Sequence, residues 1–198
     1  MQKREWISFI HNILDPSGTS KKWHPKQIEF AITMAYNQYI QSIPPYLYDE
    51  HEFLVKEYTG QVAVLDATRQ LYYITLPAAL VPMNPPSEAV RHIAGDEGTG
   101  ALDYVPCDET TWELMDGLFS HDLHGSSIGY IVRYDKIWFS DEVDTPITVR
   151  LVLAVPFSEF SDTEEVNLPS GDVNIVQTAV QLLMNTQPMD QKNNNANQ

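Results

Sequence analysis

The chain has 198 residues, of which 43% are hydrophobic and 20% charged, and this composition favours a globular fold over a disordered chain. Its single cysteine, Cys107, excludes an internal disulfide, and no apolar run reaches the roughly 18 residues of a membrane-spanning helix. The formal net charge of −15 lies almost wholly in residues 95–172, which hold 17 acidic and 3 basic residues, and an acidic surface opposes binding to nucleic acid.

The first two predicted elements are amphipathic helices. Residues 3–14 repeat apolar side chains three and four positions apart, as a helix with one buried face does, and the pattern stops at Asp15 and Pro16. No small-residue cleavage pattern follows, so we expect no signal peptide. The second helix begins at Pro25, a residue that the first helical turn accepts, and ends near Ser42. The apolar stripes are Trp6, Phe9, Ile10, Ile13 and Leu14 in the first helix, and Ile28, Ile32, Ala35, Tyr36, Tyr39 and Ile43 in the second.

From Glu52 the pattern changes to short strands. The first three are expected to form a meander, with Gly60 and residues 66–69 as its turns. A proline-rich loop follows at 77–86, because proline cannot donate a hydrogen bond to a strand ladder. Two further strands flank an acidic connection at 95–100, and a short helix is expected at 110–118. The predicted strands are Phe53–Tyr58, Val62–Leu65, Leu71–Leu76, Val90–Ile93 and Leu102–Val105.

The clearest two-residue periodicity lies in residues 128–156. Along 147–155 every second residue is large and apolar, which predicts a strand with one buried face. Ahead of it, the runs 128–134 and 137–139 are separated by Asp135 and Lys136 and together predict a hairpin.

An acidic loop at 158–165 precedes the last predicted helix. Ser170 is its expected N-cap, with Asp172 in the first turn, and we expect the helix to pack on the sheet or on the second helix. Residues 185–198 are too rich in asparagine and glutamine to fold alone, which predicts a disordered tail unless another chain holds it, and we infer such a neighbouring chain. The apolar face of the last helix is Val173, Val176, Ala179, Val180, Leu182 and Leu183.

These elements predict an α+β fold with an antiparallel, sandwich-like β core, two N-terminal helices and one C-terminal helix. We expect one domain at 1–184, helical at 1–43, β-rich at 52–156 and helical again at 170–184. Residues 185–198 form the polar tail.

Residue types that carry chemistry show no spacing that predicts a site. The segment 125–129 matches G-x-S-x-G, but a hydrolase needs a strand before Ser127 and a helix after it, and here a loop precedes and a strand follows. His121 and His124 flank Asp122 and could share a metal, yet no third ligand stands at a telling distance. The acid pairs lack the spacing of a calcium loop. We therefore expect no catalytic, cofactor-binding or metal-binding residues, and no enzyme activity.

Several pieces, taken in order, resemble a known class of virion protein. They are Leu71–Pro77, Val90–Ile93, Ile128–Tyr130, Lys136–Phe139, the strand 147–155, and the entry into the last helix at Leu168 and Pro169. In order and spacing they resemble ring or adaptor proteins of the head-to-tail connector of tailed bacteriophages, in the crAss-like group and its relatives. The resemblance covers residues 25–185.

This resemblance implies a non-enzymatic structural protein in the neck or tail region of a virion. The chain would form a homo-oligomeric ring of twelve copies between the portal protein and the tail or other ring proteins. DNA would pass through the ring without specific binding, and neither a cofactor nor a membrane is expected to take part.

The sequence offers candidate interface residues for such a ring. The apolar stripes of the first two helices are larger than a small sheet can cover, which favours packing between subunits. The candidate interface residues are Trp6, Phe9, Ile13, Tyr36, Tyr39, Gln187 and Asn193.

Three other functions remain open on the sequence. The chain could be a tail or baseplate component of a virion. It could be a β-rich glycan-binding module that uses Trp112 and Trp138 as stacking platforms, although tryptophans of this kind more often lie in a core. It could be a hydrolase that uses Ser127 as its nucleophile.

Overall fold

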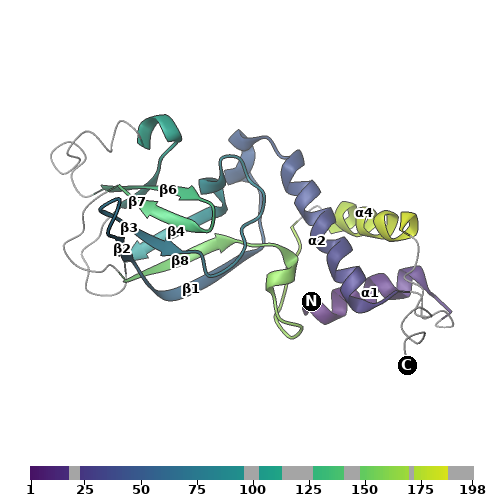
Figure 1. Ribbon diagram of the computed structural model, residues 1–198. Coiled ribbons are helices and arrows are strands. Elements are labelled where there is room, and N and C mark those ends of the chain that lie inside the picture. The colour runs from purple at the N-terminus through teal and green to yellow at the C-terminus, as the bar shows by residue number, and fades with distance from the viewer. Residues whose placement is uncertain (18–22, 96–102, 113–126, 141–147, 170–171, 187–198) are drawn as a thin grey trace, which may run out of the picture. The chain divides into compact units, whose positions relative to one another are not determined.

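The computed structural model describes residues 1–17, 23–95, 103–112, 127–140, 148–169 and 172–186 (Figure 1). The chain forms two compact units. Unit 1 contains the described residues of 1–43, 49–54 and 156–198, and unit 2 contains those of 44–48 and 55–155. The predicted α+β class is confirmed. The expectation that residues 1–184 form a single domain stays a prediction, because two compact units can belong to one domain.

Unit 1 is helical. Its α-helices are α1 (Lys3–Leu14), α2 (Pro25–Ser42) and α4 (Asp172–Asn185), and Phe157–Glu159 forms a short 3-10 turn, η4. The predicted bounds of α1 and α2 are confirmed. Helix α2 begins where its sequence provides a cap, because the His24 side chain accepts a hydrogen bond from the Lys26 amide (3.2 Å) and Gln27 Oε1 accepts one from the His24 amide (2.9 Å).

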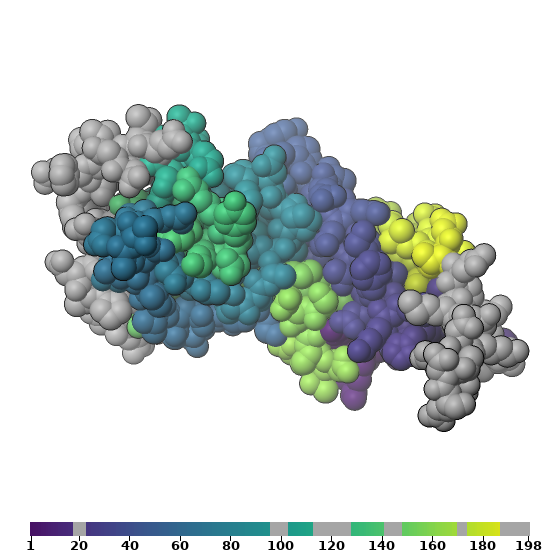
Figure 2. Space-filling view, in the orientation of Figure 1, coloured from purple at the N-terminus to yellow at the C-terminus, as the bar shows by residue number. Residues whose placement is uncertain are grey.

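The core of unit 1 forms where α4 packs along α2 (Figures 1 and 2). This confirms the second helix as the partner of the last one. Of the predicted apolar face of α4, Ala179 and Leu183 are buried as expected, whereas Val176 and Val180 are only half-buried. The buried Ile175 was not included in that prediction. Helix α2 contributes Ile28, Ala31, Ile32, Ala35, Tyr36 and Ile40 to the same core.

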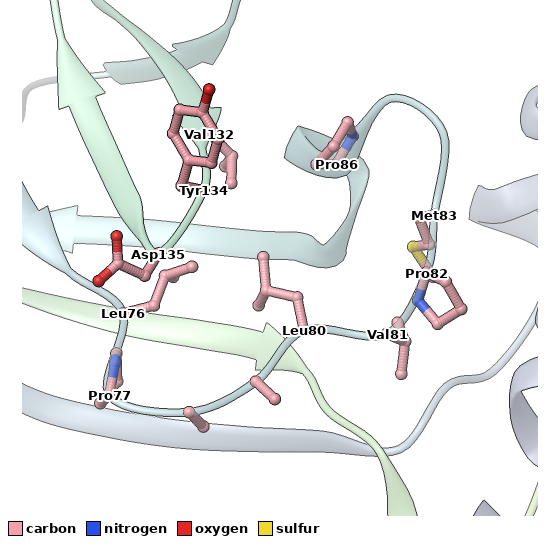
Figure 3. Close-up of a pocket in the computed structure, with 12 residues that line it drawn as sticks. Leu76, Pro77, Leu80, Val81, Pro82, Met83, Pro86, Val132, Tyr134 and Asp135 are labelled. Atoms are coloured by element: carbon pink, nitrogen blue, oxygen red, sulfur yellow. The ribbon is translucent and has the colours of Figure 1, made fainter. Parts of the chain in front are cut away.

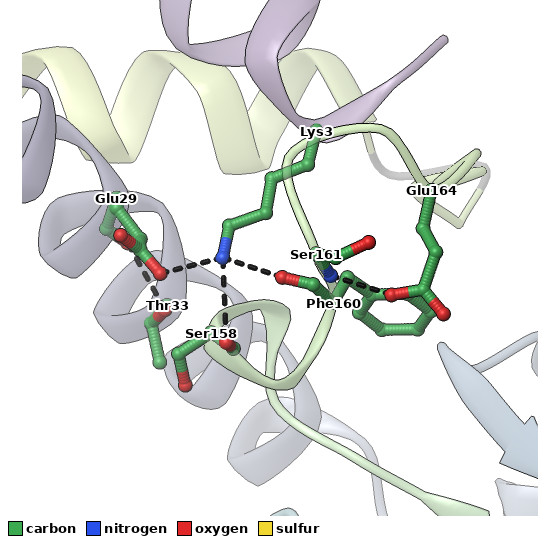
Figure 4. Close-up of polar contacts among 7 residues, drawn as sticks. All are labelled: Lys3, Glu29, Thr33, Ser158, Phe160, Ser161 and Glu164. Atoms are coloured by element: carbon green, nitrogen blue, oxygen red, sulfur yellow. Dashed lines mark hydrogen bonds and ion pairs between the residues drawn. The ribbon is translucent and has the colours of Figure 1, made fainter.

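The start of α1 is held by the acidic segment 158–166. The Lys3 amide donates to the Glu164 carbonyl (3.0 Å), and the Val166 amide donates to the Met1 carbonyl (2.8 Å). The Trp6 indole donates to the Val166 carbonyl (2.9 Å). The Lys3 ammonium donates hydrogen bonds to the Glu29 carboxylate and to two backbone carbonyls of this segment (Figure 4). The segment predicted as an acidic loop is therefore fastened along its length.

Unit 2 contains two β-sheets in the described part of the chain. In the first, β8 (Thr148–Ala154) lies between β1 (Val55–Val62) and β4 (Val90–Gly95), all antiparallel. The second has the order β2 (Val64–Asp66), β3 (Leu71–Thr75), β7 (Lys136–Phe139), β6 (Ser127–Arg133), β5 (Asp103–Pro106), with β5 parallel to β6. Short 3-10 turns occur at Pro45–Glu50 (η1) and Pro86–Ala89 (η2).

The two sheets are joined by the chain and by side chains. Ala63 alone separates β1 from β2, so the chain passes directly from one sheet into the other. The Tyr130 hydroxyl on β6 donates to the Val90 carbonyl at the start of β4 (3.4 Å). On β8, Val149, Leu151 and Leu153 are fully buried, which confirms the predicted strand with one buried face.

The predicted three-stranded meander is wrong. Strand β1 pairs with β8 across a long stretch of sequence, and only β2 and β3 form the expected hairpin. Gly60 is not a turn but lies within β1, where the pairing register shifts between Tyr58 and Gln61. Its φ of +68° explains the glycine, because this backbone conformation disfavours side chains with a Cβ.

The hairpin predicted in 128–139 is confirmed as β6 and β7. Arg133 pairs with Lys136, so the turn consists of Tyr134 and Asp135, one residue earlier than expected. The predicted short helix at 110–118 is described only through Trp112, and residues 109–112 are helical. No helix in the described ranges combines the length and apolar character that crossing a bilayer requires.

Several expectations fall outside the described residues. They concern the acidic connection at 96–100, the metal-site candidates His121, Asp122 and His124, the acidic residues 141–144, the cap Ser170, and the tail with Gln187 and Asn193.

Candidate functional site

An apolar groove opens on unit 2 beside the hairpin of β6 and β7 (Figure 3). One wall is the proline-rich loop 76–86, which cannot join a sheet because its prolines lack amide hydrogens. Two hydrogen bonds fix this loop: the Leu76 amide donates to the Asp135 carbonyl (2.7 Å), and the Val81 amide donates to the Ala154 carbonyl (3.1 Å). We call this feature the unit 2 groove.

The unit 2 groove has a volume of about 580 Å³, within the range of sites that hold small molecules or several side chains. Its opposite wall comes from Val132, Tyr134 and Asp135. Tyr134 is 98% exposed and stands at the rim, and Asp135 is the one charged residue among those that line the groove. The remaining lining residues are Leu76, Pro77, Ala78, Ala79, Leu80, Val81, Pro82, Met83 and Pro86.

The two cations next to Asp135 in sequence are engaged away from the groove. The Arg133 guanidinium forms an ion pair with Glu109 and lies over the Trp112 ring, 5.9 Å from its centroid. The Lys136 ammonium lies 3.8 Å from the centroid of the Tyr73 ring. The groove therefore presents an apolar floor with one carboxylate at its edge.

A second candidate surface lies on the outer face of α2. Phe30 is 67% exposed and Met34 is 37% exposed, and they stand four residues apart on one side of the helix. The exposed Lys26 continues the same line one turn earlier. Among the described residues no ion pair holds Lys26. We call Lys26, Phe30 and Met34 the α2 stripe.

Helix α1 carries a similar pair. Phe9 and Ile13 are 44% and 41% exposed, although the sequence pattern places them on the same stripe as the buried Trp6 and Ile10. The Phe9 ring meets the Trp6 ring edge-on, with centroids 6.2 Å apart, so Phe9 covers the edge of the core and leaves its other side open. Further exposed apolar residues, Val62, Val64 and Leu65, flank the crossover from β1 to β2.

The structure separates the interface residues predicted from the sequence. Phe9 and Ile13 lie on the surface, whereas Trp6 and Tyr36 belong to the core of unit 1. Tyr36 Oη accepts a hydrogen bond from the Leu54 amide (2.7 Å), and burial raises its pKa. Tyr39 is half-buried, with its hydroxyl 3.2 Å from His51 Nδ1. Trp6 and Tyr36 are therefore core residues of unit 1, and Phe9 and Ile13 are the described members of the predicted set that lie on the surface.

Phe30 and Met34 were missed in the sequence. The signal was present, because both residues lie on the otherwise polar face of α2, opposite the stripe that includes Ile28 and Ile32. Two large apolar residues on the polar face of an amphipathic helix depart from the usual pattern, in which that face is polar.

The aromatic residues considered for glycan stacking are buried. Trp112 and Trp138 are each 4% exposed and form a core cluster with Cys107 and Ile131. The Arg69 guanidinium lies over the Trp138 ring, 4.7 Å from its centroid, and covers it further. Burial also raises the pKa of the Cys107 thiol, which disfavours the reactive thiolate. This cluster stabilises unit 2 and does not offer a platform for a sugar.

The motifs with possible chemistry are placed as follows. Strand β6 begins at Ser127, so a strand follows this serine where a hydrolase needs a helix. In the acid pair 108–109, Asp108 caps a turn by accepting from the Thr111 amide (2.6 Å), which lowers its pKa, and Glu109 pairs with Arg133. Within the described ranges no three metal-binding side chains gather in one place.

No protein-family model matches the chain, and no curated protein sequence is similar to it.

Proposed function

We propose that this chain is a non-enzymatic structural subunit that assembles into a closed ring. In the setting implied by the sequence resemblance, the ring is an adaptor in the neck of a tailed bacteriophage, between the portal protein and the tail, with twelve copies around the DNA channel. The chain would contribute surfaces for assembly, and its neighbours would be further copies of itself and other ring or tail proteins.

The observation that carries this proposal is the apolar surface of the two N-terminal helices. Phe9 and Ile13 on α1, and Phe30 and Met34 on α2, are exposed as pairs spaced by one helical turn. Single exposed apolar residues are ordinary, but pairs of them on two helices that contact each other support the proposal of an interaction surface. Covering a side chain such as Phe30, two thirds exposed, contributes about 1–2 kcal/mol.

The distribution of charge supports the same proposal. Residues 1–43 hold five basic and three acidic residues, a net charge of +2, and residues 44–198 hold seven basic and 24 acidic residues, a net charge of −17. Exposed cations on the first two helices, such as Lys26, can pair with carboxylates of a neighbouring copy. A strongly acidic wall would also let DNA pass, because it offers phosphates few cations.

The experiment is a measurement of assembly by light scattering after size exclusion. We expect the wild-type chain to form a ring, and the double variant Phe9→Ser, Ile13→Ser to weaken assembly about tenfold, because two exposed apolar side chains no longer become buried. The monomer should lose some stability, because the Phe9 ring gives up its contact with Trp6, but clearly less than a core variant loses.

Two control variants make this result specific. Met184→Ser removes a side chain that is 66% exposed on α4, outside the two N-terminal helices, and should leave assembly unchanged. Trp6→Ser removes a core residue and its indole hydrogen bond, so it should lower the stability of the monomer itself. If Phe9→Ser, Ile13→Ser destabilises the monomer as Trp6→Ser does, α1 is a core element only and the surface proposal fails.

A further inference from the structure

The α2 stripe and the unit 2 groove are both apolar and carry opposite charges. The stripe consists of two exposed apolar side chains that follow the exposed Lys26, spaced four residues apart at 26, 30 and 34. The groove is apolar with one carboxylate, Asp135, among its lining residues. A helix that lays side chains spaced three or four residues apart into an apolar groove is a recurring mode of protein recognition.

We propose that the α2 stripe of one copy docks into the unit 2 groove of a second copy of this chain. Phe30 enters the trough between Leu80 and Tyr134, Met34 lies beside it, and Lys26 meets Asp135 at the rim. This inference rests on the proposed ring function and names one contact between successive copies in the ring.

The groove volume fits this occupant. About 580 Å³ is more than a single aromatic side chain fills, so Phe30 and Met34 enter together. The polar tail of residues 187–198 is a poorer occupant, because its sequence offers only Met189 as a large apolar side chain. An anionic ligand is also disfavoured, because the charged group at the rim is a carboxylate.

The contact is heterologous, since the two surfaces belong to different parts of the chain. The α2 stripe lies in unit 1 and the groove lies in unit 2, so each copy uses one surface of each kind. Such contacts repeat from copy to copy and generate rings when the rotation between copies closes. At the contact itself the charges are opposite, because the exposed Lys26 belongs to the stripe and Asp135 lines the groove.

The test uses two full-length variants, each with one surface disabled. Phe30→Glu places a charge on the stripe and leaves the groove intact, and Leu80→Glu places a charge in the groove and leaves the stripe intact. We expect each variant alone to be monomeric by native mass spectrometry. An equimolar mixture should form a one-to-one heterodimer that grows no further, because only one intact stripe and one intact groove can meet.

This mixing experiment also controls for folding, because a misfolded variant could not complement its partner. Failure of the mixture to form heterodimers, or assembly of either variant as in the wild type, overturns the docking proposal. If the wild type and both variants all form rings, the result supports the ring function and contradicts the stripe–groove contact. If the wild type stays monomeric, the result contradicts both the ring function and the stripe–groove contact.

The pair at the rim provides an independent measurement. Lys26→Glu and Asp135→Lys should each weaken assembly several-fold, and the two changes combined in one chain should restore it, because the opposite charges then meet in reverse. Gln38→Glu adds a negative charge at an exposed α2 position beyond the stripe and serves as the matched control, with a smaller expected effect. Absence of rescue in the double variant would contradict the proposed pairing of Lys26 with Asp135.

Discussion

The ammonium of Lys3 is buried in unit 1 and surrounded by acceptors. It lies 2.6 Å from Glu29 Oε1, 2.6 Å from the Phe160 carbonyl and 3.3 Å from the Ser158 carbonyl (Figure 4). The Phe157 ring centroid is 5.8 Å away. A buried charge is tolerated when its donors are satisfied, so this one residue joins α1, α2 and the segment 157–160.

Lys3→Met should therefore destabilise the chain. Removal of the cation leaves the Glu29 carboxylate, 26% exposed, without its partner, and the expected loss is about 2–4 kcal/mol, below that for a fully buried pair. The measurement is urea-induced unfolding followed by helical circular dichroism. Arg4→Met, at the next and exposed position, is the control and should cost less than about 0.5 kcal/mol. Equal losses for the two variants would show that the Lys3 contacts contribute little.

Two buried tyrosines make stability depend on alkaline pH. Burial raises the pKa of Tyr36 in unit 1 and of Tyr130 in unit 2 above the ordinary value near 10. Below about pH 10 both states keep these protons, so the stabilisation is complete. Above it the unfolded chain ionises first, and the free energy of unfolding should fall by up to about 1.4 kcal/mol per pH unit for each tyrosine.

The check is a series of urea unfolding curves from about pH 9 to about pH 11. In Tyr36→Phe the free energy of unfolding should fall less steeply with pH, because only one of the two buried tyrosines remains to ionise. The variant should also lose about 1–3 kcal/mol at neutral pH, because the Leu54 amide no longer has its acceptor. An identical decline in wild type and Tyr36→Phe would mean that Tyr36 does not govern this pH dependence.

At the scale of elements, the bend in β1 depends on Gly60. Its φ of +68° is disfavoured for residues with a Cβ, and a Cβ added there would meet no atom within 4 Å. Gly60→Ala should thus cost about 1–2 kcal/mol through the backbone alone, and Gly60→Asn should cost less, because asparagine tolerates this conformation. Thermal unfolding of both variants is the measurement. A fully stable Gly60→Ala would contradict the bulge between Tyr58 and Gln61.

Local signals explain which elements the sequence could predict. The bounds of α1 and α2 follow from stop and start residues nearby, Asp15 and Pro16, Pro25, and Pro44. The pairing of β1 with β8 could not be predicted, because it depends on contacts about 90 residues apart and on the single residue Ala63 that carries the chain between sheets. A meander is the simpler arrangement when only neighbouring strands are visible.

The candidate surfaces were predicted only in part, for a similar reason. Phe9 and Ile13 belong to an apolar stripe that the sequence shows. Tertiary packing decides which residues of this stripe become buried under α2 and the segment 157–166 and which stay exposed. Trp6 and Tyr36 follow the same kind of periodic pattern in the sequence as Phe9 and Ile13, but they are core residues in the structure. The unit 2 groove forms where the loop 76–86 contacts the turn of the β6–β7 hairpin, and sequence periodicity does not predict contacts between a loop and a turn.

At the scale of the whole molecule, the proposal joins the charge asymmetry to the two surfaces. A basic–apolar stripe lies on α2 and an apolar groove with an acidic rim lies on unit 2, in a chain that carries a net charge of +2 in residues 1–43 and −17 in residues 44–198. Contacts between unlike surfaces close into a ring or extend into a filament, according to the rotation between successive copies. The central claim is that the rotation closes.

Electron microscopy of the purified chain, averaged over end-on views, distinguishes a closed ring from an open filament. We expect a closed annulus with rotational symmetry, an open centre, and a mass near twelve times the 22.5 kDa of one chain. Dispersed monomers, or open filaments of indefinite length, at concentrations and ionic strength matched to a virion would contradict it.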